Sequence, residues 1–469
     1  MSPVFPAQVF RAYDIRGKVS SLTPEFIYAV ANGLAALFLE HGQTKIVLGF
    51  DARLDSETYA NIIQTVCIEK GLQVQRIGQC SSPLMYFSAR QNGGNGIMVT
   101  ASHNEKTDNG IKWILQGLPP SPEMIQEVAQ KSQPYFTNNI KTPKVDFLVH
   151  PKFIQQYVDF IKTDIKLKHT FKVVVDGLNG SAGKLAVDVL ENLGCEVIAL
   201  RCDANGHFPD HAPDPSKEQH LEKLKNAVIK HQADLGFALD GDGDRLVMVD
   251  EHAKLISADQ LLCLFTEMCL KIHPQHEIVF DVKCSTMVRN TIRTLGGSAK
   301  MIRTGSTFLR KYLAQSQGKA VFGGEYAGHY VFNDGRGLGY DDGLYACVRI
   351  LEYLSESELK TVSALFKAYP ARSSTEDLYI PTSGVKTNEV LADIEQSSQK
   401  LAAELSKIDG VRLDFDDGFG IIRASNTGEY FTVRFDADNS ARLDDIRDTF
   451  VTMLRDKYPT IAQDILDAQ

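Results

Sequence analysis

The chain has 469 residues, and at the usual ~150 residues per domain this length predicts about three domains, with four possible. Hydrophobic residues make up 43% and charged residues 23%, so the chain can build full cores and is not a largely disordered protein. The net charge of −9 gives no general attraction to nucleic acid or to an anionic membrane, so an anionic ligand needs a local basic site.

The sequence predicts neither a secretory signal nor a membrane span, and its cysteines form no CxxC pair. No apolar run approaches the ~18 residues that span a bilayer, and the first residues lack a basic region followed by an apolar stretch. The eight cysteines are scattered with no CxxC pair, which favours reduced core thiols over a disulfide framework or a zinc site. We therefore expect a cytoplasmic protein with no nucleic-acid or membrane partner.

Strands and helices alternate along most of the chain. The periodicity predicts helices at 24–41 and 56–70 on either side of a buried strand at 45–50. The same strand-turn-helix pattern returns with strands at 172–176 and 278–281, followed by helices to about residues 194 and 295. Each strand ends at an aspartate: Asp51, Asp176 and Asp281. We interpret this as an internal triplication of an α/β unit with mixed sheets, although any α/β protein can give such units by chance.

The last hundred residues follow a different pattern. A long helical stretch at 386–406 precedes short strands near 411–415 and 419–424, then a strand at 430–435 and a final amphipathic helix at about 441–457. This arrangement is typical of an α+β domain. We therefore expect a fourth, smaller domain of another type.

The strongest single motif is DGDGDR at 240–245, which lies between two probable buried strands. Three carboxylates at alternate positions, Asp240, Asp242 and Asp244, can all point at one hard cation because the glycines between them are flexible. Oxygen ligands at this density suit Mg²⁺. The glycine and glutamate that would complete an EF-hand are missing. A solvated acidic turn is the alternative.

The second motif is TASHN at 100–104, continuing to NGIK at 109–112. Ser102 would lie on a loop after an apolar strand, where it can act as a nucleophile or carry a phosphate. His103, Asn104 and Lys112 can hydrogen-bond an anion there. No GxSxG elbow surrounds the serine, which disfavours acyl transfer. A plain polar loop remains an alternative reading.

Three further motifs carry polar groups in glycine-rich or basic turns. GGEYAGH at 323–329 offers Glu325 and His329 for sugar hydroxyls and proton exchange, and RASNTG at 423–428 offers an arginine with hydroxyl and amide donors for a phosphate monoester. FRAYDIRG at 10–17 places two basic residues near an N-terminal strand. Each of these motifs is weak when it is taken alone.

Together, in this order, the five motifs resemble those of the α-D-phosphohexomutase family, most closely its bacterial phosphomannomutase/phosphoglucomutase branch. They span residues 10 to 428, which is nearly the whole chain. The resemblance implies three related mixed-sheet α/β domains plus a C-terminal α+β domain around a central cleft. We expect domain I at 1–147 with the phosphoserine loop, domain II at 148–254 with the metal-binding loop, domain III at 255–367 with the sugar-binding loop, and domain IV at 368–469 with the phosphate-binding loop.

The resemblance also implies roles for individual residues. The catalytic residues would be Ser102, which carries a phosphoryl group, with His103, Lys112, Arg245 and His329. One Mg²⁺ per chain would be held by Asp240, Asp242, Asp244 and a phosphoserine oxygen of Ser102. The substrate-binding residues would be Tyr13, Arg16, Arg303, Glu325, Ala327, Arg423, Ser425, Asn426 and Thr427.

The implied reaction converts hexose 6-phosphate to hexose 1-phosphate and back, on mannose, glucose or both. A phosphoserine enzyme and a 1,6-bisphosphate intermediate, which also serves as activator, would carry the phosphate. The expected partners are small hexose phosphates only, with the chain a monomer or a weak homo-oligomer. Phosphoglucosamine mutase and a Mg²⁺-dependent sugar phosphatase remain alternatives, and a non-catalytic sugar-phosphate sensor is disfavoured by the intact serine and aspartates.

The sequence departs from the common family patterns in three places. Glu105 follows SHN where proline is frequent, so the loop there lacks one source of rigidity. Tyr326 and Ala327 stand where Met and Ser are usual, which removes a hydroxyl near the sugar. Ser306 stands where histidine is frequent. The last two changes bear on sugar preference and on one proton-handling role.

Overall fold

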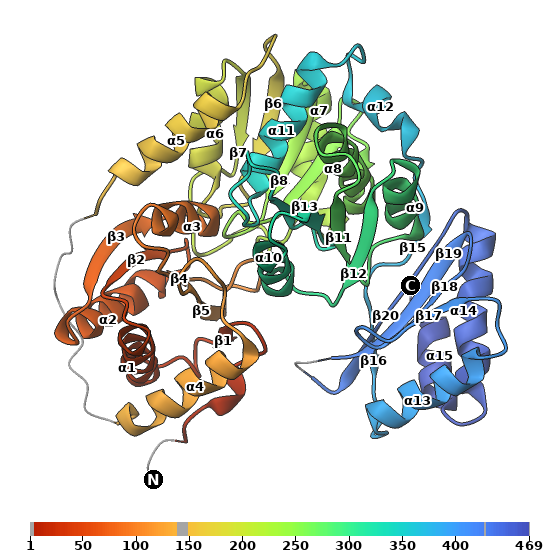
Figure 1. The fold of residues 1–469 in the computed structure, drawn as a ribbon, viewed down its shortest axis with the longest axis horizontal. Coiled ribbons are helices and arrows are strands. Elements are labelled where there is room, and N and C mark those ends of the chain that lie inside the picture. The colour runs from red at the N-terminus through yellow and green to blue at the C-terminus, as the bar shows by residue number, and fades with distance from the viewer. Residues whose placement is uncertain (1–3, 138–148, 426–427, 469) are drawn as a thin grey trace. The chain divides into compact units, whose positions relative to one another are not determined.

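A computed structural model describes residues 4–137, 149–425 and 428–468 of the chain (Figure 1). The chain divides into two compact units. Unit 1 comprises Met1–Ile256 and Ala327–Leu365, and unit 2 comprises Ser257–Tyr326 and Phe366–Gln469. None of the described helices is long and apolar enough to cross a membrane.

The first sheet of unit 1 has the strand order β1-β5-β4-β2-β3. Its strands are β1 (Ile15–Lys18), β2 (Lys45–Phe50), β3 (Gln73–Gln79), β4 (Gly96–Val99) and β5 (Asp108–Ile114). The helices of this part are η1 (Ala7–Val9), α1 (Pro24–Glu40), α2 (Ser56–Glu69), α3 (Ser82–Arg90), α4 (Pro122–Ser132), η2 (Gln133–Tyr135) and α5 (Lys152–Asp164). The central strands β2 and β4 pair in parallel, and the edge strand β1 pairs antiparallel with β5.

Both faces of this sheet are covered because its central strands are apolar on both sides. Ile97 and Val99 of β4 belong to the core that includes α1, α2 and α4. Gly96, on the opposite face of the same strand, approaches Met85 and Ala89 of α3 so closely that a Cβ atom would collide with them. Figure 1 shows α1 and α4 on one side of the sheet and α3 on the other.

The second sheet of unit 1 repeats this layout with the order β10-β9-β8-β6-β7. Its strands are β6 (Lys172–Asp176), β7 (Glu196–Leu200), β8 (Leu235–Leu239), β9 (Leu246–Asp250) and β10 (Leu255–Ile256). The helices of this part are α6 (Gly183–Asn192), η3 (Glu218–Leu221) and α7 (Glu222–His231). The remainder of unit 1 contains β14 (Tyr330–Phe332), α11 (Gly343–Glu356) and α12 (Val362–Leu365).

Unit 2 begins with a third α/β segment. It contains α8 (Ala258–Ile272), β11 (Glu277–Asp281), α9 (Thr286–Thr294), β12 (Ser298–Ile302), α10 (Ser306–Gln315) and β13 (Ala320–Gly324). In all three segments the strand at whose end the aspartate lies (Asp51, Asp176 or Asp281) pairs in parallel with two strands: β2 with β3 and β4, β6 with β7 and β8, and β11 with β12 and β13. The predicted triplication of an α/β unit with mixed sheets is therefore confirmed.

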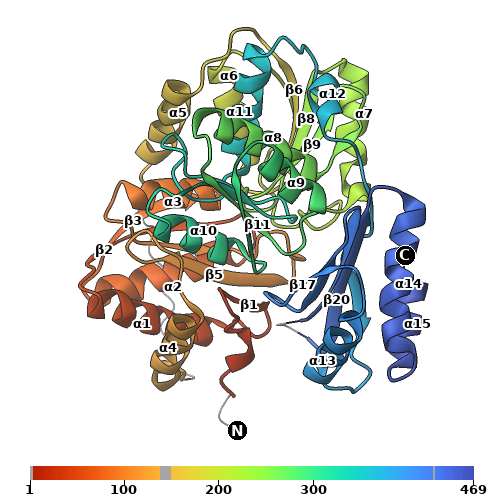
Figure 2. The same cartoon turned by 45° about the vertical axis from the view of Figure 1, so that its right-hand side comes forward.

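The C-terminal part of unit 2 is an antiparallel sheet covered by helices. Its strands are β15 (Ser373–Ser374), β16 (Leu378–Pro381), β17 (Glu404–Ser406), β18 (Val411–Asp414), β19 (Gly418–Ala424) and β20 (Tyr430–Ala437). The helices are η4 (Phe366–Ala368), α13 (Thr387–Ser398), α14 (Ser440–Arg455) and α15 (Pro459–Asp467). Figure 2 shows α14 beside this sheet with α15 next to it. Apolar side chains of α14, including Phe450, pack on β19 and β20.

Two expectations for this region were wrong. The helix predicted at 386–406 ends at Ser398, and Glu404–Ser406 instead pairs antiparallel with β18. Tertiary strand pairing overrides a local helical pattern there. The helix predicted at 441–457 is not the final one, because α15 follows it with Pro459 at its first turn, where a missing N–H does no harm.

Candidate functional site

The three aspartates of the DGDGDR motif lie together in the loop between β8 and β9. Asp240, Asp242 and Asp244 are all buried, and carboxylate oxygens of the three lie within 4.8 Å of one another. The glycines between them are needed: a Cβ on Gly241 would lie 2.4 Å from the Ser102 carbonyl oxygen, and Gly243 has a φ of +77°. The loop therefore brings its carboxylates together by a close approach to the serine loop.

Ser102 lies directly against this acidic loop. Its Oγ donates a hydrogen bond of 2.6 Å to Oδ2 of Asp240, and Nδ1 of His103 lies 3.2 Å from the same Oγ. The residue is 2% exposed and has a φ of +53°, in the left-handed region that serine rarely adopts. Burial, with Arg245 and Arg16 nearby, holds the pKa of His103 well below its usual value.

Lys112 and the start of α3 neutralise part of the acidic cluster. Nζ of Lys112 lies 2.8 Å from Oδ2 of Asp242 and 2.9 Å from Oδ2 of Asp244. Ser82, in the first turn of α3, donates its Oγ hydrogen to Oδ2 of Asp242 (2.5 Å) and its N–H to the backbone carbonyl of Asp242 (2.8 Å). Burial alone would raise the pKa of Asp242, but Lys112 and the hydroxyl hydrogen bonds outweigh it and hold that pKa below its usual range.

The cluster of Asp240, Asp242 and Asp244 has the features expected of a divalent-cation site. Oδ1 of Asp242 and Oδ1 of Asp244 are buried without a hydrogen-bond partner among the described residues. Burial, followed by repulsion from Asp244 and Asp242, raises the pKa of Asp240 well above its usual value. A cation held by oxygen ligands would satisfy the orphaned atoms and remove the repulsion, so the donor set fits Mg²⁺.

Arg245 and His329 form a second layer around the acidic loop. Nε of Arg245 donates to Nε2 of His329 at 3.1 Å, and Nδ1 of His329 lies 3.0 Å from Oδ2 of Asp341. Burial lowers the pKa of His329, but Asp244 and Asp341 outweigh it and raise that pKa above its usual value. Because Arg245 donates to Nε2, the proton of the neutral ring belongs on Nδ1, the nitrogen that lies 3.0 Å from Asp341.

Arg16, on β1, adds a residue from the N-terminal part of the chain to the group around Ser102. Its Nη1 donates to Oδ1 of Asn104 at 3.1 Å, and its Nη2 pairs with Asp14 at 2.6 Å. Tyr13, partly exposed, precedes that strand, and the half-buried Ala327 begins the second segment of unit 1. Unit 1 thus brings together all five predicted catalytic residues, the three aspartates and Arg16.

The other predicted substrate-binding residues belong to unit 2. Glu325 is buried and accepts a hydrogen bond from the N–H of Gly305. The guanidinium of Arg303 lies 4.3 Å from the Phe308 ring centroid. Arg423, on β19, donates through Nε to Oδ2 of Asp409 at 3.1 Å, and the N–H of Thr304 donates to the same oxygen at 3.3 Å.

Asp409 therefore joins Arg423 to the 303–306 turn, which also carries Ser306 at the start of α10. Ser425 follows Arg423 at the end of β19, and its N–H donates to the carbonyl of Tyr430. Asn426 and Thr427, which were predicted to bind substrate, lie outside the described residues. Tyr326, where methionine is usual, has its ring 3.7 Å from the buried guanidinium carbon of Arg434.

Several residues of the site were not found from the sequence. Arg53 and Thr100 hold the serine loop, Asp341 contacts His329, Ser82 contacts Asp242, and Asp409 pairs with Arg423. For Arg53 there was a signal, because it follows one of the three strand-end aspartates by two residues. Thr100 lies inside the TASHN motif, but no role was assigned to it, and Asp341, Ser82 and Asp409 have no local pattern that points to the site.

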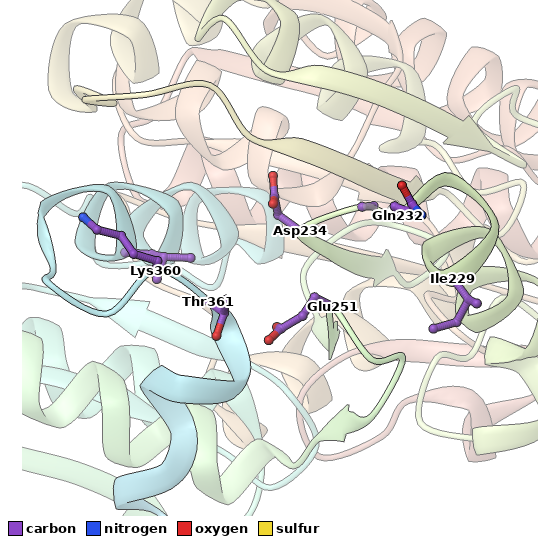
Figure 3. A pocket seen from close by; sticks show the side chains of 8 residues that line it. Ile229, Gln232, Asp234, Glu251, Lys360 and Thr361 are labelled. Atoms are coloured by element: carbon purple, nitrogen blue, oxygen red, sulfur yellow. The ribbon is translucent and has the colours of Figure 1, made fainter.

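A cavity of about 330 Å³ lies elsewhere in unit 1 (Figure 3). Its lining includes Asp234, Glu251 and Lys360, but none of the predicted site residues. Asp234 lies just before β8 and Asp240 just after it, so at ~3.3 Å per residue these two residues are about 20 Å apart. The cavity is therefore separate from the candidate site.

Four family models match consecutive parts of the chain. They are described as phosphoglucomutase/phosphomannomutase alpha/beta/alpha domain I (residues 7–138), domain II (152–254), domain III (257–372) and C-terminal domain (384–453). The phosphomannomutase/phosphoglucomutase of Pseudomonas putida is 36% identical over 456 residues, which cover 96% of each chain.

Solved structures show the same similarity. A phosphoglucomutase/phosphomannomutase family protein from Burkholderia thailandensis has a TM-score of 0.88 and 32% identity, covering 96% of this chain and 98% of that one. The N-acetylphosphoglucosamine mutase of Aspergillus fumigatus is known with glucose 1,6-bisphosphate (TM-score 0.61, 13% identity, 97% and 96% covered) and with GlcNAc-6P and magnesium (0.57, 15%, 97% and 97%). At these identities the Aspergillus protein shares only the fold.

Proposed function

This chain belongs to the phosphoglucomutase/phosphomannomutase family, a family of phosphohexomutases, and we propose that it interconverts the 6-phosphate and 1-phosphate of mannose, glucose or both. The phosphate travels through a phosphorylated Ser102 and a hexose 1,6-bisphosphate. The observation that carries this proposal is the 2.6 Å hydrogen bond from Oγ of Ser102 to Asp240. It puts the serine hydroxyl of the TASHN motif against the three aspartates that could hold Mg²⁺.

The proposed cycle consists of two phosphoryl transfers. Phospho-Ser102 gives its phosphoryl group to a free hydroxyl of the sugar monophosphate: the P–Oγ bond breaks, a new P–O bond forms, and the hydroxyl loses its proton. The bisphosphate then turns around, and its other phosphoryl group returns to Oγ of Ser102. Such transfers depend mainly on in-line positioning and on neutralisation of charge.

The residues around Ser102 suit these two requirements. Lys112 and Arg245 lie at the acidic loop and would steady the phosphoryl group in transit. When bound to Asp240, Asp242 and Asp244, Mg²⁺ would supply the charge that offsets a phosphate of about −1.5 to −2. His329 is assigned proton exchange with the sugar hydroxyl, and Arg245 and Asp341, which lie 3.1 and 3.0 Å from its two ring nitrogens, orient the imidazole.

The remaining predicted site residues are assigned to substrate binding. We propose that the chain forms four domains, with the limits 1–147, 148–254, 255–367 and 368–469. Tyr13, Arg16, Arg303, Glu325 and Ala327 would contact the sugar or its phosphates. Arg423, Ser425, Asn426 and Thr427 would hold the phosphate that is not being transferred. Asp409 would hold the Nε edge of Arg423 while Nη1 faces the phosphate.

A substrate survey tests the proposal directly. We expect mutase turnover on mannose 1-phosphate, glucose 1-phosphate or both when the matching 1,6-bisphosphate is added as activator, measured by coupled detection of the 6-phosphate. Turnover on glucosamine 1-phosphate alone would replace the proposal with a phosphoglucosamine mutase. Release of inorganic phosphate without formation of a bisphosphate would replace it with a phosphatase.

Replacing Arg423 by alanine separates phosphate binding from chemistry. A charge-assisted hydrogen bond to phosphate contributes roughly 1.5–3 kcal/mol, so we expect KM for both the 1-phosphate and the 6-phosphate to rise about ten- to several-hundred-fold. Phosphorylation of Ser102 should persist, since that residue lies in unit 1. The surface arginine Arg442, which pairs with Asp417 in the same domain, provides the control. An unchanged KM for both the 1-phosphate and the 6-phosphate would refute the proposed role of Arg423 in phosphate binding.

A further inference from the structure

The guanidinium of Arg53 uses four of its five N–H groups on the stretch that carries Ser102 and the fifth on Asp51. Its Nε donates to Asp51 (3.1 Å), Nη1 to the carbonyls of Glu105 (2.7 Å) and Asp108 (3.0 Å), and Nη2 to the carbonyls of Ser102 (2.7 Å) and Asn104 (2.7 Å). Five is the full donor capacity of arginine. One side chain therefore binds four carbonyls of the seven-residue stretch 102–108.

Asp51 connects the same arginine to the other side of Ser102. Its Oδ2 accepts from Nε of Arg53 and from Oγ1 of Thr100 at 2.7 Å, and Oγ1 of Thr100 accepts the N–H of Ser102 at 2.8 Å. The carbonyl of Ser102 is thus held by Arg53 directly, and its N–H is held through Thr100 and Asp51. The carbonyl and the N–H of Ser102 are therefore both connected by hydrogen bonds to the Arg53–Asp51 ion pair, which is buried: the Arg53 side chain is 2% exposed.

This support matters because the loop is strained. Ser102 has a φ of +53°, a conformation that persists in serine only where the surrounding structure holds it. Glu105 also stands where the resembling family often has a proline, so the chain itself supplies less rigidity. The carbonyl of Glu105 is one of the four that Arg53 binds. The ring of Phe208 lies 5.4 Å from the guanidinium carbon and packs on the pair.

We infer that Arg53 is a positioning residue for Ser102: through the loop backbone it sets the direction of the serine Oγ toward Asp240. The inference rests on the proposed phosphoryl-carrying role of Ser102. A lysine at position 53 has three donors and no planar fork, so it can satisfy at most three of the five acceptors. The expected consequence is a displaced serine in a protein that still folds.

The second α/β segment offers a matched control. Arg201 pairs with Asp176, the equivalent strand-end aspartate, through Nε at 2.9 Å, and it also donates to the carbonyl of His220 at 3.0 Å. Among the described residues, Arg201 hydrogen-bonds Asp176, Asp210, His211 and His220, all of which lie outside the serine loop. Arg201→Lys therefore disturbs the same kind of ion pair without touching the loop of Ser102.

The test compares Arg53→Lys with Arg201→Lys by kinetics and hydrogen exchange. For Arg53→Lys we expect kcat to fall about ten- to a hundred-fold with KM unchanged within about threefold, since a small misplacement of a reacting group acts on the transition state. Amide exchange in a peptide covering 101–108 should become at least about tenfold faster, because local opening is easier. Arg201→Lys should leave both quantities within about twofold of wild type, whatever its effect on Tm.

Thr100→Val keeps the test decisive if Arg53→Lys fails to fold. It preserves shape, removes the acceptor of the Ser102 N–H, and should give the same fall in kcat and the same faster exchange. The inference would be overturned if amide exchange at 101–108 in a folded Arg53→Lys or Thr100→Val protein were as slow as in the wild type. Equal losses of kcat in Arg53→Lys and Arg201→Lys would also overturn it. A wild-type protein without mutase turnover would refute the proposed function instead, and the exchange comparison would still decide the role of Arg53.

Discussion

Replacing Ser102 by alanine is expected to reduce mutase turnover by about 10³- to 10⁵-fold, which corresponds to ~4–7 kcal/mol of activation free energy. The proposed cycle has no other carrier for the phosphoryl group, so the residual rate would come from water or a neighbouring hydroxyl acting weakly. Part of the purified wild-type protein should carry one phosphate on Ser102. Intact-protein mass before and after phosphatase treatment measures this, and the alanine variant should show no change.

Ser132→Ala is a suitable control for this experiment. Ser132 is also buried, but its hydroxyl donates only within α4, to the carbonyl of Val128 at 2.6 Å. It should retain both phosphorylation and turnover. Full activity of Ser102→Ala, together with a wild-type mass that phosphatase does not change, would remove Ser102 from the mechanism.

Removal of the metal is expected to have the second large effect. Exhaustive chelation should abolish turnover, and added Mg²⁺ should restore it. Asp242→Asn should lower kcat by about 10²- to 10⁴-fold, or ~3–5.5 kcal/mol, with a smaller change in KM, because the charge that the metal offsets develops at the transferring oxygen. Calorimetric titration with Mg²⁺ should show weaker binding to the variant.

The matched control is Asp250→Asn, at the far end of β9. Asp250 is equally buried, but its Oδ1 accepts backbone N–H groups of His252 and Lys254 at 3.0 and 2.8 Å, which an amide oxygen also does. We expect Asp250→Asn to keep its Mg²⁺ affinity and its kcat. Undiminished turnover after chelation would leave the DGDGD run as a structural turn.

The local sequence predicted the strands and helices of the repeated units to within one or two residues. The strand at Lys45–Phe50 and the helix at Pro24–Glu40 are examples, because a continuous apolar run and a 3.6-residue period each have one good local solution. The helix predicted to continue to residue 406 failed because Glu404–Ser406 gains strand hydrogen bonds from β18, a partner that no local pattern reveals.

The sequence by itself determined the chemistry available at the site: a serine in a polar loop, three alternating carboxylates and several basic turns, each readable because the residue types lie close together in the chain. Only the tertiary structure decided which groups meet. Ser102 and Asp240 are 138 positions apart, and Lys112 and Asp242 are 130 apart, yet both pairs are within hydrogen-bond distance. The contacts that Arg53 and Asp341 make could not be read from the sequence for the same reason: a contact depends on distance in space, and β-sheet topology brings together loops that local periodicity cannot relate.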